Sequence, residues 1–357
     1  MMFENYSIWD KLKNTIKPIF LYGTGNGGDK IISALETRGG RLTGVFASAG
    51  FVRDRSFHGF KVLSYDAVVA EYGSDIIILL AFGTTLPSVR EFIDHLDRTH
   101  ELIIPDVPLY SGEVFDYEYF LTHKSELEDA KGLLSDDRSR AIFDDAVNFR
   151  LTGKLKYLLN TCSFADALGE FWCKGEINCI LDGGAFKGDT SADFAEVLSP
   201  KDIFAVEADP KTHKKLCDYA DFEVRSNVIP INAALWDNDC ELEYVSSASR
   251  GSGESGANKR AKVTQIPALT IDTILKDNAV DLIKLDIEGA EHSALDGAVY
   301  TLSDKQPNMI VSLYHRTDDL FSLIKRISKA LPNHKLYLRR VDCIPFWDLN
   351  LYAVKTK

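Results

Sequence analysis

The chain has 357 residues, a net charge of -12, and hydrophobic and charged contents of 45% and 26%. This length predicts two domains, no apolar run approaches the length of a membrane span, and an acidic chain repels nucleic acid. The six cysteines form no C-x-x-C pair, which argues against a zinc cluster, and the N-terminus lacks an apolar signal core. We therefore expect a cytoplasmic protein with reduced thiols, no membrane span and no nucleic-acid partner.

The first part of the chain alternates apolar runs with helical patterns. The apolar runs cover residues 16–23, 41–48 and 75–82. This alternation predicts a parallel sheet covered by helices, in a small Rossmann-like α/β domain over residues 1–105. Residues 106–176 carry apolar positions at three- and four-residue spacing, so we expect a helical connector there.

A glycine-rich turn follows the first apolar run. Gly23, Gly25 and Gly28 fit the G-x-G-x-x-G pattern of turns that bind a pyrophosphate. The acid expected about twenty residues later is missing, because Ala47 and Ser48 stand there. Three interpretations stay open: a purely structural turn, a nucleotide- or nucleotide-sugar-binding turn, and the cofactor site of a nicotinamide-dependent oxidoreductase.

A second alternation begins near residue 177. Five apolar runs cover residues 177–182, 202–209, 228–235, 280–289 and 308–315. The runs 334–340 and 349–355 have no clear helix between them and predict a hairpin. We therefore expect a doubly wound α/β sheet with an antiparallel edge strand, in a domain over residues 177–357.

Polar and small residues follow these strands. Asp182 ends the first strand, and Gly183 and Gly184 would leave room for a ligand against the backbone. Glu207 ends the second strand, at the edge where open α/β sheets bind ligands, and can accept both hydroxyls of a ribose. The alternative is that Asp182 and Glu207 are helix caps or surface acids. Asn232 closes the third strand with small residues that would admit an adenine ring.

The predicted ligand is an adenosine without phosphates, because no lysine or further glycine motif here addresses a phosphate chain. S-adenosylmethionine is the common ligand of this kind. The predicted cofactor contacts are Asp182, Gly183, Gly184, Ala185, Glu207, Ala208, Asn232, Ala233 and Asp286.

Several of these stretches resemble the FkbM family of S-adenosylmethionine-dependent methyltransferases. They include "ILDGGAFKGDT", "AVEADP" and "VDLIKLDIEGAEHSALDGA", with the core "KLDIEGAE" at 284–291. The resemblance covers about residues 177–357. It implies a class I methyltransferase fold, cofactor contacts at Asp182, Gly184 and Glu207, and O-methylation of a hydroxyl on a sugar or natural product. Ala208 departs from the proline usual in this family.

Methyl transfer to an alcohol needs alignment and a base. We favour His315 as that base, since a neutral imidazole near pH 7 accepts a proton readily. Asp286 and Glu288, two residues apart after the fourth strand, are the alternatives. These three side chains could also bind magnesium or manganese. Because no further ligand stands at reliable spacing, we expect no metal.

The acceptor is not readable from the sequence beyond a small molecule or saccharide, and a homo-oligomer is possible. A glycine- and serine-rich loop at 246–262 is expected to be a lid or a solvated loop. Its Arg250, Lys259 and Arg260 would suit an anionic acceptor. Competing interpretations are an N-methyltransferase, an enzyme acting on a lipid or polyketide, and a non-enzymatic nucleotide-sugar-binding module.

Overall fold

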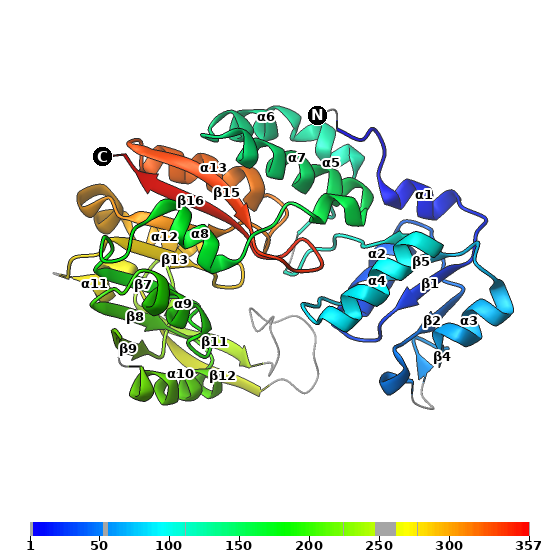
Figure 1. Ribbon diagram of the computed structural model, residues 1–357, viewed down its shortest axis with the longest axis horizontal. Coiled ribbons are helices and arrows are strands. Elements are labelled where there is room, and N and C mark those ends of the chain that lie inside the picture. Colours follow the sequence, from blue (N-terminus) through cyan, green and yellow to red (C-terminus); the bar gives the residue numbers. More distant parts are fainter. Residues whose placement is uncertain are drawn as a thin grey trace.

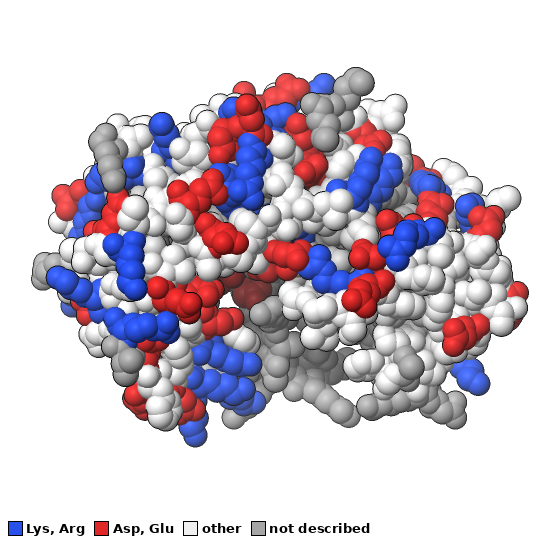
Figure 2. Space-filling view, in the orientation of Figure 1, with Lys and Arg blue, Asp and Glu red and all other residues white. Residues whose placement is uncertain are grey.

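A computed structural model of the chain describes residues 3–52, 56–110, 112–223, 225–246, 262–276 and 278–356. Two α/β parts follow one another along the chain (Figure 1). Helices from the middle of the sequence run along the top of the view, beside the C-terminal sheet. Figure 2 shows that acidic and basic side chains are interspersed over this face of the molecule.

The N-terminal sheet has the strand order β3-β4-β2-β1-β5-β6. Its strands are β1 (Ile19–Tyr22), β2 (Gly44–Phe46), β3 (Ser56–Phe57), β4 (Phe60–Leu63), β5 (Ile77–Leu80) and β6 (Glu101–Ile103). All neighbours pair in parallel except β3 and β4. The helices are α1 (Ile8–Asn14), α2 (Asn26–Thr37), η1 (Ala49–Phe51), α3 (Tyr65–Tyr72) and α4 (Pro87–Thr99). The apolar runs predicted β1, β2 and β5 but missed the other three strands, which have only two to four residues.

Helices follow the N-terminal sheet. They are α5 (Tyr117–Thr122), α6 (Lys124–Gly132), α7 (Asp137–Thr152), η2 (Leu155–Leu158) and α8 (Phe164–Phe171). The hydroxyl of Ser139 in α7 accepts a hydrogen bond of 2.8 Å from the backbone amide of Leu338. These helices therefore pack on the C-terminal sheet, and the division of the chain at residues 105 and 176 stays a prediction.

The C-terminal sheet has the strand order β15-β16-β14-β13-β7-β8-β9. Its strands are β7 (Cys179–Gly183), β8 (Asp202–Val206), β9 (Asn227–Ile231), β13 (Leu282–Leu285), β14 (Asn308–Ser312), β15 (His334–Arg340) and β16 (Leu349–Lys355). Only β16 runs against its neighbours. The predicted hairpin of the last two strands is thus confirmed, with the reversed strand lying one position in from the edge.

The remaining C-terminal elements connect these strands. The helices are α9 (Asp189–Val197), α10 (Pro210–Phe222), α11 (Ile271–Leu275), α12 (Glu291–Asp296), the π-helix η3 (Thr301–Lys305) and α13 (Asp319–Ala330). A small sheet contains β10 (Ala234–Leu235), β11 (Cys240–Ser246) and β12 (Lys262–Leu269). The predicted strands around the glycine- and serine-rich loop pair antiparallel. Arg250, Lys259 and Arg260 of that loop lie outside the described residues.

The strand order creates a switch point between β7 and β13. From β7 the chain moves outward to β8 and β9, then crosses back to β13 and β14 on the other side of β7. The carboxyl ends of these parallel strands share one edge of the sheet, and ligands of open α/β sheets bind at such an edge. Asp182 and Gly183 are the last residues of β7, and the other predicted site residues follow the ends of these strands.

The two α/β parts contact each other directly. Thr84, after β5, forms an isolated antiparallel bridge with Ile344, and Arg90 of α4 pairs with Asp342. Gly83 lies against the indole of Trp347, where an added Cβ would be 2.4 Å from the ring. Within the described ranges, no helix combines the length and apolar character that crossing a membrane requires.

Candidate active site

Asp182 lies beneath the turn that follows β7. One carboxylate oxygen accepts hydrogen bonds from the hydroxyls of Thr190, at 2.9 Å, and Ser191, at 2.7 Å. Lys284 Nζ lies 3.4 Å from the other oxygen, and Asp182 has no exposed surface. The carboxylate therefore ties the turn to the first residues of α9. The contacts of Asp182 in this structure are thus made within the protein, and its predicted cofactor contact stays a prediction.

The two glycines of this turn are required by packing within the protein. At Gly184, φ is +75° and an added Cβ would lie 1.9 Å from the carbonyl oxygen of Asp286. At Gly183, an added Cβ would lie 2.7 Å from a methyl group of Leu235. The ends of β13 and β10 thus fill the space on the Cβ side of these glycines, and their predicted cofactor contacts stay a prediction. Ala185 is also fully buried.

Glu207 stands at the tip of β8 with both oxygens fixed. One oxygen accepts from the amide of Phe186 at 3.0 Å, and the other accepts from the amide of Asp209 at 2.8 Å. Burial raises the pKa of Glu207 to about 7, although these two hydrogen bonds oppose the shift. The residue is 9% exposed, and its predicted contact with a ribose stays a prediction.

Asn232 holds the turn after β8 in place. Its amide nitrogen donates to the carbonyl of Glu207 at 2.8 Å and to that of Ala208 at 3.2 Å. Ala208 is half-buried, whereas Ala233 is buried. Asn232 therefore orients the turn that carries Glu207, and the adenine contact predicted for this stretch stays a prediction.

Lys284 joins the turn after β7 to the acids after β13, and sequence reasoning assigned it no role of its own. Its buried ammonium donates to the carbonyl of Gly184 at 3.0 Å and lies 3.8 Å from Asp286. Burial lowers the pKa of Lys284, but the carboxylates of Asp182 and Asp286 outweigh burial and raise it. The lysine therefore remains charged and fixes the spacing between these two acids.

The structure brings the three predicted catalytic residues together. Nε2 of His315, after β14, lies 3.4 Å from Asp286 and 3.7 Å from Glu288. The hydroxyl of Tyr314 donates to Asp286 at 2.9 Å. Burial opposes ionisation of Asp286, but Lys284 and His315 outweigh it and lower its pKa. Asp286 is therefore an ionised carboxylate at neutral pH.

His315 differs from its prediction in its charge. Its Nδ1 lies 2.8 Å from a carboxylate oxygen of Glu291, and both side chains are 1% exposed. Burial alone would lower the pKa of His315, but Glu291, Asp286 and Glu288 raise it to about 10. The imidazole thus holds two protons at neutral pH. The three surrounding carboxylates thus disfavour the neutral imidazole expected of a base, and the role of His315 as proton acceptor stays a prediction.

Asp286, Glu288 and His315 are also the candidate metal ligands, and the absence of a metal at this site stays a prediction. Within the described part of the chain, no group of three or more histidine, cysteine, aspartate or glutamate side chains has the arrangement of a metal site.

The cluster contains two further residues, Glu291 and Tyr110, that the sequence did not place there. Glu291 accepts hydrogen bonds from the backbone amides of Ile287, at 3.0 Å, and Gly289, at 3.4 Å, so it fixes the turn as well as His315. Tyr110 donates a hydrogen bond to Glu288 across 178 positions of sequence. No local signal marks Tyr110, because its partner belongs to the other sheet.

The N-terminal glycine turn is explained largely by packing. An added Cβ at Gly23 would lie 2.7 Å from the ring of Phe82, and one at Gly27 would lie 2.3 Å from the carbonyl of Ala81. Open space surrounds Gly25 alone among the glycines of this turn. A nucleotide, nucleotide-sugar or nicotinamide ligand at this turn stays a prediction.

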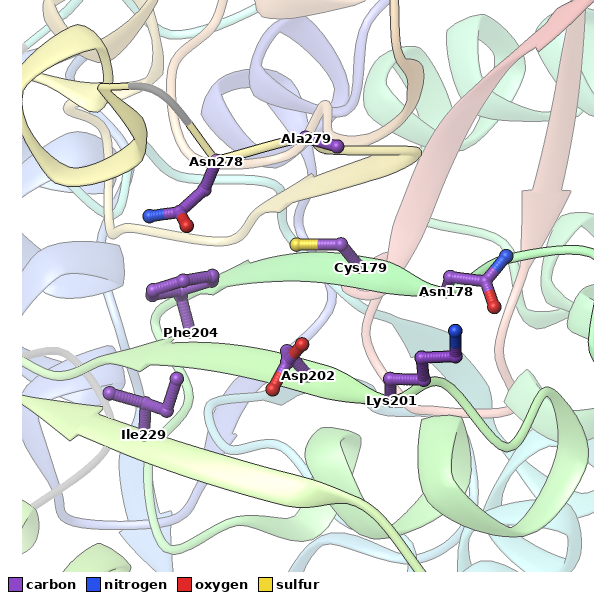
Figure 3. A pocket seen from close by; sticks show the side chains of 8 residues that line it. All are labelled: Asn178, Cys179, Lys201, Asp202, Phe204, Ile229, Asn278 and Ala279. Carbon is purple, nitrogen blue, oxygen red and sulfur yellow. The ribbon is translucent and has the colours of Figure 1, made fainter.

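A cavity of about 290 Å³ lies at the opposite edge of the C-terminal sheet (Figure 3). Cys179 of β7, Phe204 of β8 and Ile229 of β9 come from adjacent strands and line it. Its lining residues, all within the described ranges, include none of the predicted site residues. This cavity is therefore separate from the acid cluster at the carboxyl edge.

Comparison with solved structures confirms the fold class. The methyltransferase FkbM from Methylobacillus flagellatus KT superposes with a TM-score of 0.72 at 20% identity, over 97% of this chain and 92% of that one. Fibrillarin from Aeropyrum pernix has a TM-score of 0.32 at 15% identity, covering 51% of this chain and 67% of that one. TYW2 from M. jannaschii has a TM-score of 0.30 at 16% identity, covering 53% and 72%. The last two scores are too low to support an inference.

Sequence comparison identifies the C-terminal part of the chain. None of the curated proteins matches it. Residues 182–337 match the family described as the Methyltransferase FkbM domain, in agreement with the resemblance of the strand-end motifs. This part of the chain is therefore similar to the FkbM methyltransferase domain over residues 182–337, and its fold is that of the FkbM structure.

Proposed function

We propose that this chain transfers the methyl group of S-adenosylmethionine to a hydroxyl of a small acceptor, such as a saccharide or nucleotide sugar. One observation carries the proposal. Glu207 lies on one side of the turn after β7, and the paired acids Asp286 and Glu288 lie on the other, all at the carboxyl edge of the sheet. This arrangement offers a carboxylate for a ribose and a separate acid cluster for an acceptor.

The residues around Glu207 suit the adenosine of the donor. The two backbone amides fix the carboxylate, which then faces a ligand with accepting lone pairs. When bound, S-adenosylmethionine supplies an electrophilic methyl group and leaves as a neutral thioether. No acid is therefore needed for the leaving group, and the chain must supply alignment and a proton acceptor.

Asp286 is the proton acceptor that the geometry favours. Its carboxylate is ionised at neutral pH, is held by Tyr314, and lies beside the His315 imidazolium. A hydroxyl becomes strongly acidic as its oxygen gains a methyl group, so a carboxylate of lowered pKa suffices as base. The imidazolium stabilises the negative charges of Asp286 and Glu288, which lie 3.4 Å and 3.7 Å from its Nε2.

Glu207→Ala tests the donor site. We expect the Kd for S-adenosylmethionine to rise about ten-fold or more in calorimetric titration. The reason is that alanine has no carboxylate to accept hydrogen bonds from the two ribose hydroxyls. The matched control is Glu196→Ala, which removes an exposed acid of α9. An absence of binding to the wild-type chain would contradict the proposed function.

The raised pKa of Glu207 gives the same site a pH dependence. Only the ionised carboxylate accepts both ribose hydroxyls, and the carboxylate is protonated as pH falls through about 7. We expect wild-type affinity to be about ten-fold weaker at pH 6 than at pH 8. Glu207→Gln should lose this difference, and titration of the ligand itself affects both proteins alike. An equal pH dependence in both proteins would exclude Glu207 as the cause.

A further inference from the structure

The segment after β6 brings a side chain from outside the C-terminal sheet to the acid cluster. The hydroxyl of Tyr110 donates a hydrogen bond to Glu288, and its ring lies edge-on to His315 with ring centroids 6.0 Å apart. The ring also lies against Gly289, where an added Cβ would be 3.2 Å from Tyr110. Tyr110 therefore covers the turn that carries Glu288.

The backbone of that turn needs external support. Glu288 has a φ of +60°, a left-handed conformation that a residue with a side chain adopts at an energetic cost. Arg316 donates to the carbonyl of Gly289 at 2.7 Å and holds the turn from the β14 side. Tyr110 holds the Glu288 side chain at its carboxylate, the end away from the backbone. The direction of the Glu288 carboxylate thus depends on Tyr110.

Tyr110 is itself held by the N-terminal part of the chain. Lys30 of α2 donates to the carbonyl of Pro108 at 3.1 Å and to that of Leu109, immediately before Tyr110. On the other side, the hydroxyl of Thr317 donates to the carbonyl of Glu113 at 2.6 Å. The segment is therefore fixed between the N-terminal glycine-turn helix and the turn after β14.

We infer that Tyr110 is a positioning residue of the methyl-transfer site, which fixes the Glu288 carboxylate beside His315, and that Lys30 fixes Tyr110. This inference rests on the proposed function and extends it to the N-terminal part of the chain. That part contributes to the site through Lys30 and the segment it holds. Burial and the nearby Glu288 raise the pKa of Tyr110, so its hydroxyl keeps its proton and acts only as a donor.

His315 reports on the position of Glu288 without any acceptor. The ionisable groups around the ring are Glu291 from α12, Asp286 and Glu288 after β13, the hydroxyls of Tyr110 and Tyr314, and Asp319 of α13 beyond Glu291. Glu288 is one of the three carboxylates that raise the pKa of His315. A Glu288 side chain that loses its donor can turn away, and the pKa of His315 then falls.

The test compares Tyr110→Phe, Lys30→Met and the double variant in the full chain. Tyr117→Phe, in α5 of the same connecting region, is the control because it removes a hydroxyl from a half-buried tyrosine away from the cluster. The pKa of His315 is measured by NMR with histidine labelled in the ring, and His315→Gln assigns the signal. The values of kcat and KM are measured with an acceptor that the wild type methylates, and the Kd of S-adenosylmethionine by calorimetry.

We expect Tyr110→Phe to lower the pKa of His315 by about one pH unit and kcat by about ten-fold, because a hydrogen bond to a charged group is lost. The Kd of S-adenosylmethionine should stay within about two-fold of wild type. Lys30→Met should also lower the pKa of His315 and kcat. It should add no further change in the Tyr110→Phe background, since Lys30 acts through Tyr110.

An unchanged pKa of His315 in Tyr110→Phe would overturn the inference, as would an additive effect of Lys30→Met. If the wild type binds no S-adenosylmethionine, the proposed function fails and Tyr110 has no methyl-transfer site to position. If the wild type binds the donor, the NMR titration of His315 in Tyr110→Phe decides the role of Tyr110 without any acceptor.

Discussion

Asp286→Asn is expected to lower kcat for methyl transfer by about two to four orders of magnitude, the usual contribution of a positioned general base. Asparagine has the shape of aspartate and can still accept the Tyr314 hydrogen bond, but its amide takes no proton from the acceptor. The Kd of S-adenosylmethionine should change by less than about ten-fold. Single-turnover formation of the thioether product, measured with a panel of hydroxylated acceptors, gives the rate.

Asp281→Asn is the matched control. Asp281 lies at the other end of β13, where it accepts from the amides of Asn178 at 2.7 Å and Cys179 at 3.0 Å. Its replacement should leave kcat within about two-fold of wild type, because it is remote from the acid cluster. A similar loss of rate in both variants would mean that damage to the sheet, not loss of a base, explains the result.

The pH profile separates Asp286 from His315 as the base. Asp286 has a lowered pKa, so the wild-type kcat should be flat from about pH 6 to pH 9 if Asp286 accepts the proton. If His315 accepts it, kcat should rise about ten-fold per pH unit toward its pKa of about 10, because only the neutral ring is a base. A rising profile would therefore exclude Asp286 and restore His315.

The common edge of the site could be predicted because the carboxyl end of each strand is marked locally in the sequence. Apolar runs marked β7, β8, β9, β13 and β14, and parallel strands bring their carboxyl ends to one edge. Asp182, Glu207, Asp286 and His315 each follow such a run, so their common edge was predictable. The missed strands β3, β4 and β6 are as short as β1, β2 and β5 but are less completely buried, so they do not form a continuous apolar run.

The chemistry of the site depends on contacts that strand patterns do not encode. The charge of His315 follows from three carboxylates converging on one buried ring, and Glu291 reaches that ring only through the turn of "DIEGAE". The glycines after Asp182 suggested space for a ligand, but on the Cβ side Gly183 packs against Leu235 and Gly184 packs against Asp286. Tyr110 meets Glu288 only when two sheets are placed relative to one another, and local periodicity carries no such information.

Glu291→Gln is expected to lower the free energy of unfolding by about 3–5 kcal/mol, the range for removing one partner of a buried ion pair. Glutamine can still accept from the amides of Ile287 and Gly289, so the turn keeps these hydrogen bonds. What is lost is the negative charge that compensates the buried His315 imidazolium. Chemical denaturation monitored by circular dichroism measures the difference.

The loss should depend on pH in a defined direction. The folded pKa of His315 is raised from 6.5 to about 10, so the stability it contributes is fully present below pH 6.5 and is lost as pH rises through about 10. The difference between wild type and Glu291→Gln should therefore be larger at pH 6 than at pH 8 and should shrink further toward pH 10. The control is Glu126→Gln, which breaks a half-exposed pair of the same type between Glu126 and Nδ1 of His123, at 2.6 Å. Because water screens that pair, its removal should cost less than about 1 kcal/mol, and equal losses in the two variants would refute a special role for the buried pair.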